Sequence, residues 1–201
     1  MINIDDGVVF ATDRMTARQI REHDTYAGVR VVVPATVDRS QQPLRVDVNV
    51  GDPVTPAPQR IIYPGLLDES FELVGYPIET VLAEKLVMMV ALGDTTTRER
   101  DFADVVLLTG THAVHAGRLS QAITATSTHR QTTLLPLREA TTALGGRRQV
   151  DWQRYLTRAG LAGKLPGNYA TAIRLVADFA DPVVTGSRVT GQWEPRTRRW
   201  S

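Results

Sequence analysis

The feature of this sequence that most constrains its fold is a change in hydrophobic periodicity near Tyr76. Before that residue, short apolar runs alternate with turn residues, which is typical of β-strands. From Pro77 onward, apolar residues recur at the spacing of a helix face. We therefore predict an α+β protein, with a sheet region over residues 1–75 followed by a helical domain over residues 76–201.

The same periodicity predicts the individual elements. The predicted strands cover 7–12, 28–33, 44–50, 60–63 and 71–75. A short helix is predicted over 16–23, and the proline-rich segment 51–59 is predicted to be an irregular loop. The predicted later helices cover 77–92, 97–109, 117–127, 135–144, 151–158 and 168–180, and the tail 191–200 is predicted to be extended.

Composition excludes several classes of protein. The chain has 201 residues, a formal net charge of +1 and no cysteine. The absence of cysteine excludes disulfides and thiolate metal sites. No apolar run approaches the roughly 20 residues that span a bilayer, and the first residues do not resemble a signal peptide. We therefore expect a cytoplasmic protein that does not bind membranes.

Lys85 is one of only two lysines, whereas the other twenty-one basic residues are arginines. At about 100° per residue, Lys85 falls in the middle of an apolar stripe on its helix. This stripe comprises Ile78, Val81, Leu82, Leu86, Met88, Met89 and Leu92. Val87 falls on the opposite side, and Glu79, Thr80 and Glu84 are predicted to form a solvated flank. An inward lysine either meets an anion or extends its ammonium group to solvent, and the spacing does not decide between these.

Asp47 lies within the predicted strand "LRVDVNV". Leu44, Val46 and the two later valines share one face of that strand, whereas Arg45, Asp47 and Asn49 share the other. Aspartate is unfavourable inside a strand, so a partner should offset its cost. A solvated polar face is the more common explanation, but a carboxylate that projects from a sheet can also hold a divalent cation.

The segment "RERDFAD" places Arg98, Arg100, Asp101 and Asp104 at the start of a predicted helix. The apolar face of that helix is formed by Phe102, Val105, Val106 and Thr109. Such a run is usually a solvated helix with local ion pairs. Two arginines beside an inward lysine would instead form a cationic pocket that fits a phosphate group.

Other chemistry-bearing residues give weaker signals. His112 and His115 are three residues apart, which suits a metal site on a helix, but the nearby glycines favour a surface loop. Trp152 and Phe179 are predicted to lie in the core of the helical domain.

Together these segments resemble a known family. "YPIETVLAEK" (76–85) and "RERDFADVVLL" (98–108) are similar to the signature of the AbiEii/AbiGii-type nucleotidyltransferase toxins, which include the MenT-type toxins of bacterial toxin–antitoxin pairs. The resemblance extends upstream to "DDGVVF", "YAGVRV" and "RVDVNVGD", and downstream to "AITATSTHRQT" and "FADPV".

The resemblance implies a polymerase β-like nucleotidyltransferase sheet followed by a helical domain. It implies transfer of nucleotides from an NTP to the 3′ end of tRNA with Mg²⁺ or Mn²⁺, which blocks translation, and a cognate antitoxin as partner. By position in the motifs, Asp47 would be catalytic and bind metal, Lys85 would neutralise the triphosphate, Asp101 would orient Lys85, and Arg98 would contact phosphate.

One motif of the family has no counterpart in this sequence. In the family, a Gly-Gly/Ser pair and an Asp-x-Asp strand precede the segment that resembles "DDGVVF" and supply two metal-binding carboxylates. Asp5 and Asp6 are adjacent, so on a strand they would point to opposite faces. The nucleotidyltransferase sheet is therefore predicted to be N-terminally incomplete, and we expect the functional protein to carry an N-terminal extension with this motif. The alternative is a truncated or catalytically dead relative that acts only as a binding protein.

Overall fold

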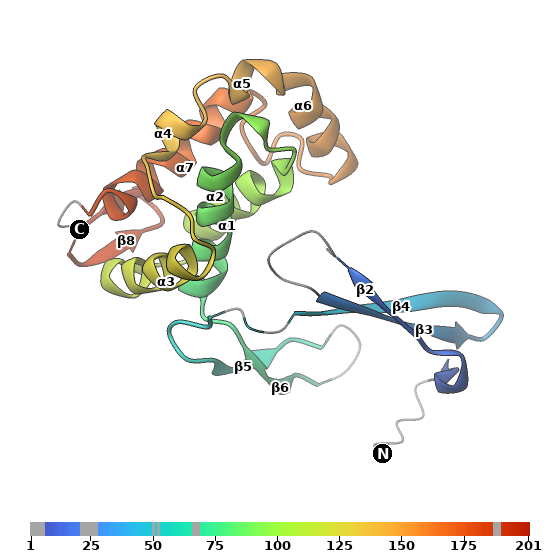
Figure 1. The fold of residues 1–201 in the computed structure, drawn as a ribbon. Helices are drawn as coiled ribbons and strands as arrows, with labels where there is room; N and C mark the ends of the chain where they lie inside the picture. Colours follow the sequence, from blue (N-terminus) through green and yellow to red (C-terminus); the bar gives the residue numbers. More distant parts are fainter. Residues whose placement is uncertain (1–6, 21–27, 50, 52, 66–68, 187–189) are drawn as a thin grey trace. The chain divides into compact units, whose positions relative to one another are not determined.

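The computed structural model describes residues 7–20, 28–49, 51, 53–65, 69–186 and 190–201 (Figure 1). It contains both sheets and helices, which confirms the predicted α+β class. Backbone contacts divide the chain into two compact units, Met1–Asp52 and Pro53–Ser201. The boundary between the units therefore lies before the strands over 59–75, which belong to the same unit as the helices. The change from strand to helix itself occurs near Tyr76, where the periodicity changes.

The first unit is a four-stranded antiparallel sheet built around one long strand. Strand β3 (Gly28–Val37) pairs along one edge with β4 (Ser40–Asn49) over its whole length. Its other edge is shared by β1 (Val8–Phe10), next to the end of β3, and β2 (Thr16–Ile20), next to its start. The short 3-10 helix η1 (Thr12–Arg14) joins these two strands. Among the described residues of this unit, only Gly28 is buried.

The helix predicted over 16–23 is wrong where the structure describes it, because Thr16–Ile20 form strand β2. Residues 21–23 lie outside the described residues. The physical reason is tertiary: Ala17 lies opposite Val31 and Gln19 lies opposite Val29, so pairing along β3 satisfies the backbone of this segment. Helix propensity over so few residues is a weak preference that such pairing overrides.

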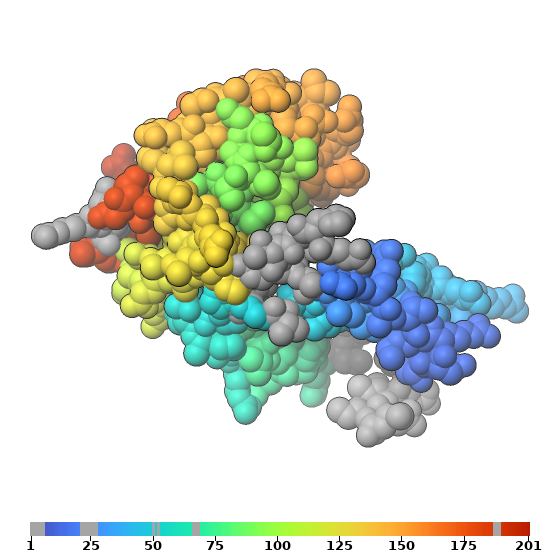
Figure 2. All heavy atoms as spheres, viewed as in Figure 1, coloured from blue at the N-terminus to red at the C-terminus, as the bar shows by residue number. Residues whose placement is uncertain are grey.

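The second unit begins with a hairpin and continues into helices. The hairpin pairs β5 (Gln59–Tyr63) with β6 (Phe71–Gly75). The helices are α1 (Ile78–Leu92), α2 (Glu99–Thr111), α3 (Ala116–His129), α4 (Leu137–Ala140), α5 (Leu144–Arg147), α6 (Gln149–Arg158) and α7 (Tyr169–Val184), with the 3-10 turn η2 (Gly93–Thr95) after α1. In the space-filling view, the green atoms of α1 and α2 are bordered by the yellow and orange atoms of later helices (Figure 2).

Helix α1 is enclosed on several sides, since α2, α3 and α4 all contact it. The predicted single stripe is therefore wrong in part: Val87, placed on the opposite side, is buried, and so are Glu79 and Thr80 of the predicted solvated flank. Periodicity assumes one buried face, whereas a helix surrounded by others has no solvated face to contrast with it. Thr80 is satisfied by donating a hydrogen bond to the carbonyl oxygen of Thr55 at 2.7 Å.

The core of this unit is formed between the long helices. Phe102, Val105, Val106 and Thr109 are all buried, which confirms the predicted face of α2. Trp152 and Phe179 are fully buried, as predicted. None of the described helices combines the length and the apolar character that crossing a membrane requires.

Two segments of this unit differ in detail from the prediction: the segment 135–144 and the C-terminal tail. In the segment 135–144, predicted to be one helix, only α4 is helical; the chain turns at 141–143, and α5 begins at the last residue of the segment. In this turn the carboxylate of Asp94 accepts hydrogen bonds from the backbone N–H of Ala143 (2.9 Å) and the hydroxyl of Thr142 (3.2 Å), which stabilises the interruption. The tail, predicted to be one extended segment, is a hairpin: β8 (Gln192–Glu194) and β9 (Arg199–Trp200) pair antiparallel across a turn over 195–198. β8 also pairs with β7 (Val114–His115).

Candidate functional site

The centre of the candidate site is an ion-pair cluster between α1 and α2. The ammonium group of Lys85, on α1, donates to Asp101 Oδ1 at 2.9 Å and to Asp104 Oδ2 at 2.8 Å, both on α2. The Lys85 side chain is 20% exposed and that of Asp101 only 8%. Lys85 therefore faces inward and meets anions, which decides between the two alternatives left open by the sequence.

Asp101 also brings Arg98 to the cluster. Arg98 donates from Nε to Asp101 Oδ2 at 2.6 Å, so its guanidinium group and the Lys85 ammonium group hold opposite oxygens of one carboxylate. Arg100 lies 3.7 Å from Asp104 Oδ2. The acidic residues of the first turn of α2 lie at the positive end of its dipole, where a negative charge stabilises the helix. Of the residues predicted from the sequence, Asp101 therefore contacts both Lys85 and Arg98 directly.

The electrostatics keep Lys85 charged. Burial lowers the pKa of its ammonium group, but hydrogen bonds to Asp104 and Asp101 and the charges of both carboxylates raise it more, so the net pKa lies above its usual value. A lysine ammonium group has three N–H donors, and two of them are used by the carboxylates. One donor is therefore left for an anion that approaches from the partly exposed side.

A second ion pair fixes the start of α2. Arg148 donates from Nε to Glu99 Oε1 at 2.6 Å, and its Nη2 lies 3.5 Å from Asp151 Oδ2 on α6. The Glu99 side chain is 11% exposed. Glu99 lies next to Arg98 and Arg100 in the sequence. The Arg148–Glu99 ion pair therefore connects the first turn of α2, which carries these arginines and Asp101, to the beginning of α6.

Asp47 lies in the other unit, on the polar face of the sheet. Arg30 of β3 lies directly opposite Asp47 and binds it with two bonds, from Nε to Oδ1 at 2.6 Å and from Nη2 to Oδ2 at 2.7 Å. The hydrogen bond to Asp47, followed by its charge, raises the pKa of Arg30. Arg18 is the register partner of Arg30 on β2, so Asp47 shares this face with several arginines. A partner does offset the cost of aspartate in a strand, as expected.

The structure thus brings Lys85, Asp101 and Arg98 together, whereas Asp47 belongs to the other compact unit. That all four line one cleft stays a prediction. The sequence missed the roles of Asp104 and Arg148. Asp104 was visible as the second acidic residue of "RERDFAD", since its spacing of three from Asp101 places both on one helix face. No local signal links Arg148 to Glu99, because they are far apart in sequence.

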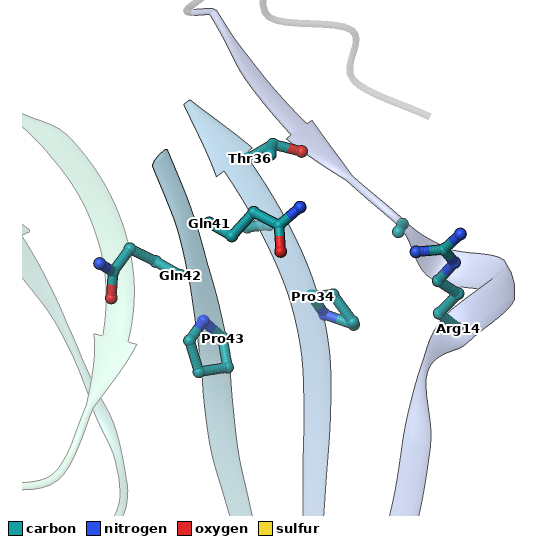
Figure 3. Close-up of a pocket in the computed structure, with 8 residues that line it drawn as sticks. Arg14, Pro34, Thr36, Gln41, Gln42 and Pro43 are labelled. Atoms are coloured by element: carbon teal, nitrogen blue, oxygen red, sulfur yellow. The ribbon is translucent and has the colours of Figure 1, made fainter. Parts of the chain in front are cut away.

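The first unit also contains a cavity of about 320 Å³ at the turn end of β3 and β4 (Figure 3). Its lining residues are Ala11, Arg14, Pro34, Ala35, Thr36, Gln41, Gln42 and Pro43. Pro34 lies opposite Pro43 in the register, whereas Asp47 lies four residues further along β4, opposite Arg30. Arg14 is the only charged residue of this lining, so the cavity offers little chemistry beyond hydrogen bonds.

The residues that the structure describes include no preformed cluster of side chains for a divalent metal ion. They contain no group of three or more histidine, aspartate or glutamate side chains arranged to hold an ion. Both oxygens of Asp47 are bound by Arg30, and a magnesium site needs further carboxylate or other oxygen ligands. His112 and His115 are exposed, as the surface prediction requires, and lie at the end of α2 and on β7. Metal binding by Asp47 stays a prediction.

The cluster thus combines a lysine on α1 with an arginine at the N-terminus of α2, and carboxylates of α2 bind both cations. The family model "Nucleotidyl transferase AbiEii toxin, Type IV TA system" matches residues 2–173, so this chain belongs to the AbiEii nucleotidyltransferase toxin family. The match includes Asp47 and the whole cluster, and it ends within α7, before the C-terminal segment that also suggested the resemblance. No curated protein and no solved structure gives a significant match.

Proposed function

We propose that this protein transfers nucleotides from an NTP to the 3′ end of tRNA in the cytoplasm and thereby blocks translation, and that a cognate antitoxin neutralises it. In this reaction the oxygen of the terminal hydroxyl group attacks the α-phosphorus of the NTP. A new P–O bond forms, the bond to the bridging oxygen breaks, and pyrophosphate leaves. The family assignment supports nucleotidyl transfer by a toxin. The polymerase β-like sheet, tRNA as acceptor and the antitoxin are part of the proposal.

The single observation that carries the proposal is the geometry of Lys85. Two carboxylates bind its ammonium group, and the side chain is partly exposed. One of the three N–H donors of this group forms no hydrogen bond with the described residues. We assign this donor to an oxygen of the triphosphate, whose negative charge moves toward the leaving pyrophosphate during transfer. Arg98 contacts a second phosphate oxygen, since its guanidinium group is half-exposed. Asp101 holds both cations in position.

Asp47 is proposed to act on the acceptor. A carboxylate that projects from a sheet can accept the proton of the attacking hydroxyl group. In the structure that carboxylate is bound by Arg30, so the arginine would have to release at least one oxygen when the acceptor binds. These steps involve residues of this chain alone, because the described residues include no cluster of three or more metal-ligating side chains.

The test is transfer of labelled nucleotide from each NTP to total tRNA. Lys85→Ala should lower the rate by about 10²–10³, since it removes an electrostatic contact to the transferring group. Lys85→Arg should also fail, because a planar guanidinium group does not replace a compact ammonium group between two carboxylates. Lys164→Ala is the matched control: it removes the only other lysine, which is exposed, and should transfer like the wild type.

Circular dichroism would verify that each variant is folded. Transfer by Lys85→Ala at the wild-type rate would contradict the proposed role of the lysine. A wild-type protein that binds tRNA or an antitoxin but transfers no nucleotide would contradict the enzymatic proposal and support the alternative, a relative that acts only by binding.

A further inference from the structure

A column of aromatic rings leads from the core of the helical unit toward the Lys85 cluster. Tyr169 and Trp152 stack with centroids 4.7 Å apart and planes at 10°. Trp152 in turn stacks on Tyr155, with centroids 6.0 Å apart and planes at 27°. Phe102 closes the inner end, edge-on to Tyr169 at 5.4 Å. The column therefore joins α2, α6 and α7.

Tyr155 is the outer end of this column. Phe102, Trp152 and Tyr169 are fully buried, whereas Tyr155 is partly exposed. A buried aromatic ring needs no explanation beyond packing. The exposed part of the Tyr155 ring is available for contact with another flat ring.

Charged residues of the Lys85 cluster act on the hydroxyl group of Tyr155. Burial and the charge of Asp104 raise the pKa of its hydroxyl group, and the charges of Arg100, Lys85 and Arg158 oppose this rise. Tyr155 thus lies within electrostatic range of the Lys85 cluster. Arg158 is on the same helix, is exposed, and forms no ion pair with the residues that the structure describes.

The charge balance of this region favours an anion. Lys85, Arg98, Arg100 and Arg158 supply four positive charges, against two negative charges from Asp101 and Asp104. Two positive charges are therefore not compensated within the group. A ligand that combines a flat ring with phosphate groups would match both the end of the column and the surrounding cations.

We infer that Tyr155 is the base-stacking residue of the site: a nucleobase stacks on its ring while the attached phosphates contact Lys85, Arg98, Arg100 or Arg158. The inference rests on the proposed function and adds a residue that the AbiEii match does not assign. A nucleobase can come from the NTP or from the terminal nucleotide of the RNA acceptor, and the ring would accept either because every base has a π-face.

Binding, rather than transfer, provides the test. The ligands are a non-hydrolysable analogue of each NTP and a single-stranded RNA that ends in a free 3′ hydroxyl group, each titrated calorimetrically against the full chain. Tyr155→Ala should weaken one of the two ligands by about 5- to 150-fold, since stacking on one base contributes that range of affinity. The ligand that is weakened identifies the source of the base.

Tyr155→Phe and Tyr155→Trp should stay within about threefold of the wild type, because each keeps an aromatic face. Tyr76→Ala is the control: it removes a half-exposed tyrosine of the same unit that is not part of the column, and it should bind both ligands normally. Wild-type affinity of Tyr155→Ala for both ligands would overturn the inference. So would a loss in Tyr155→Phe as large as that in Tyr155→Ala, since the hydroxyl group rather than the ring would then be responsible.

Failure of the proposed function gives a different pattern. A wild-type protein that binds an analogue through Tyr155 but transfers no nucleotide would contradict transfer and leave the stacking role intact. If the protein transfers nucleotide but Tyr155→Ala binds both ligands like the wild type, the transfer proposal stands and the stacking role of Tyr155 is contradicted.

Discussion

The two units of this protein hold their candidate functional residues by different means. In the helical unit, Lys85 and Asp101 lie on helices whose buried apolar side chains belong to one continuous core. In the sheet unit, Arg30 and Asp47 face each other across two strands whose described side chains are all at least partly exposed. The first pair is positioned by packing from several sides, whereas the second is positioned by strand register and by its own two hydrogen bonds.

This difference predicts where the chain tolerates change. A close-packed interior does not relax to fill a void, so a side chain removed from it leaves lost contacts. A half-exposed strand side chain has solvent on one side and loses less. The geometry around Lys85 should therefore depend on residues far from it, whereas the geometry around Asp47 should depend mainly on its direct partners.

The largest effect should come from the core. Leu119 is fully buried on α3, so Leu119→Ala should lower the free energy of unfolding by about 2–5 kcal/mol. Val46→Ala, on the apolar face of β4, should cost about 1 kcal/mol or less, because that side chain is 45% exposed. Urea denaturation of both variants measures the difference. Equal losses would mean that the sheet face is as well packed as the helical core, and the comparison between the two units would fail.

An intermediate effect should separate the two ion pairs. Asp101→Asn leaves Arg98 without its carboxylate and Lys85 with Asp104 alone in a largely buried position, so it should cost about 1–3 kcal/mol. Asp47→Asn removes a pair that is open to solvent and should change the unfolding midpoint far less. Denaturation at low and high salt is the measurement. A loss for Asp47→Asn as large as that for Asp101→Asn would show that exposure does not separate the two pairs.

The smallest effect concerns the hydroxyl group of Tyr169. It is buried, and it has no hydrogen-bond partner among the described residues. Burial, and next the charge of Glu99, raise the pKa of this group well above its reference value of 10.0. Tyr169→Phe should therefore be neutral or raise stability at pH 7 by up to about 1 kcal/mol, because it removes an unsatisfied polar group without changing the ring.

The same substitution should change the dependence of stability on alkaline pH. Above pH 10 the unfolded tyrosine loses its proton and the folded one keeps it, so stability falls as pH rises through that range. Tyr169→Phe should make this fall shallower, and thermal unfolding between pH 8 and 11 would measure it. An unchanged slope would place the hydroxyl group in contact with solvent, contrary to the structure.

Much of the helical unit could be predicted because its signals are local. The buried face of α2 followed from helical spacing, and the inward direction of Lys85 followed from its position among leucines and methionines. Segment 16–20 and the outer face of α1 could not be predicted in the same way. Segment 16–20 is a strand because it pairs with one edge of β3. The face of α1 that was predicted to be solvated is buried because other helices pack against α1 on several sides. In both cases the structure of a segment depends on a partner that lies elsewhere in the sequence, so local periodicity does not reveal it.

For the candidate site, the sequence by itself determined the residue types and their spacing: a lysine on an apolar helix, an arginine and two aspartates on the next, and an aspartate in mid-strand. Only the tertiary structure decided which charges meet. It showed that Asp101 binds both Lys85 and Arg98, that Arg30 binds Asp47, and that Arg148 holds Glu99. The physical reason is that ion pairs between distant segments depend on distances of a few ångströms, and chain packing sets those distances while sequence spacing does not.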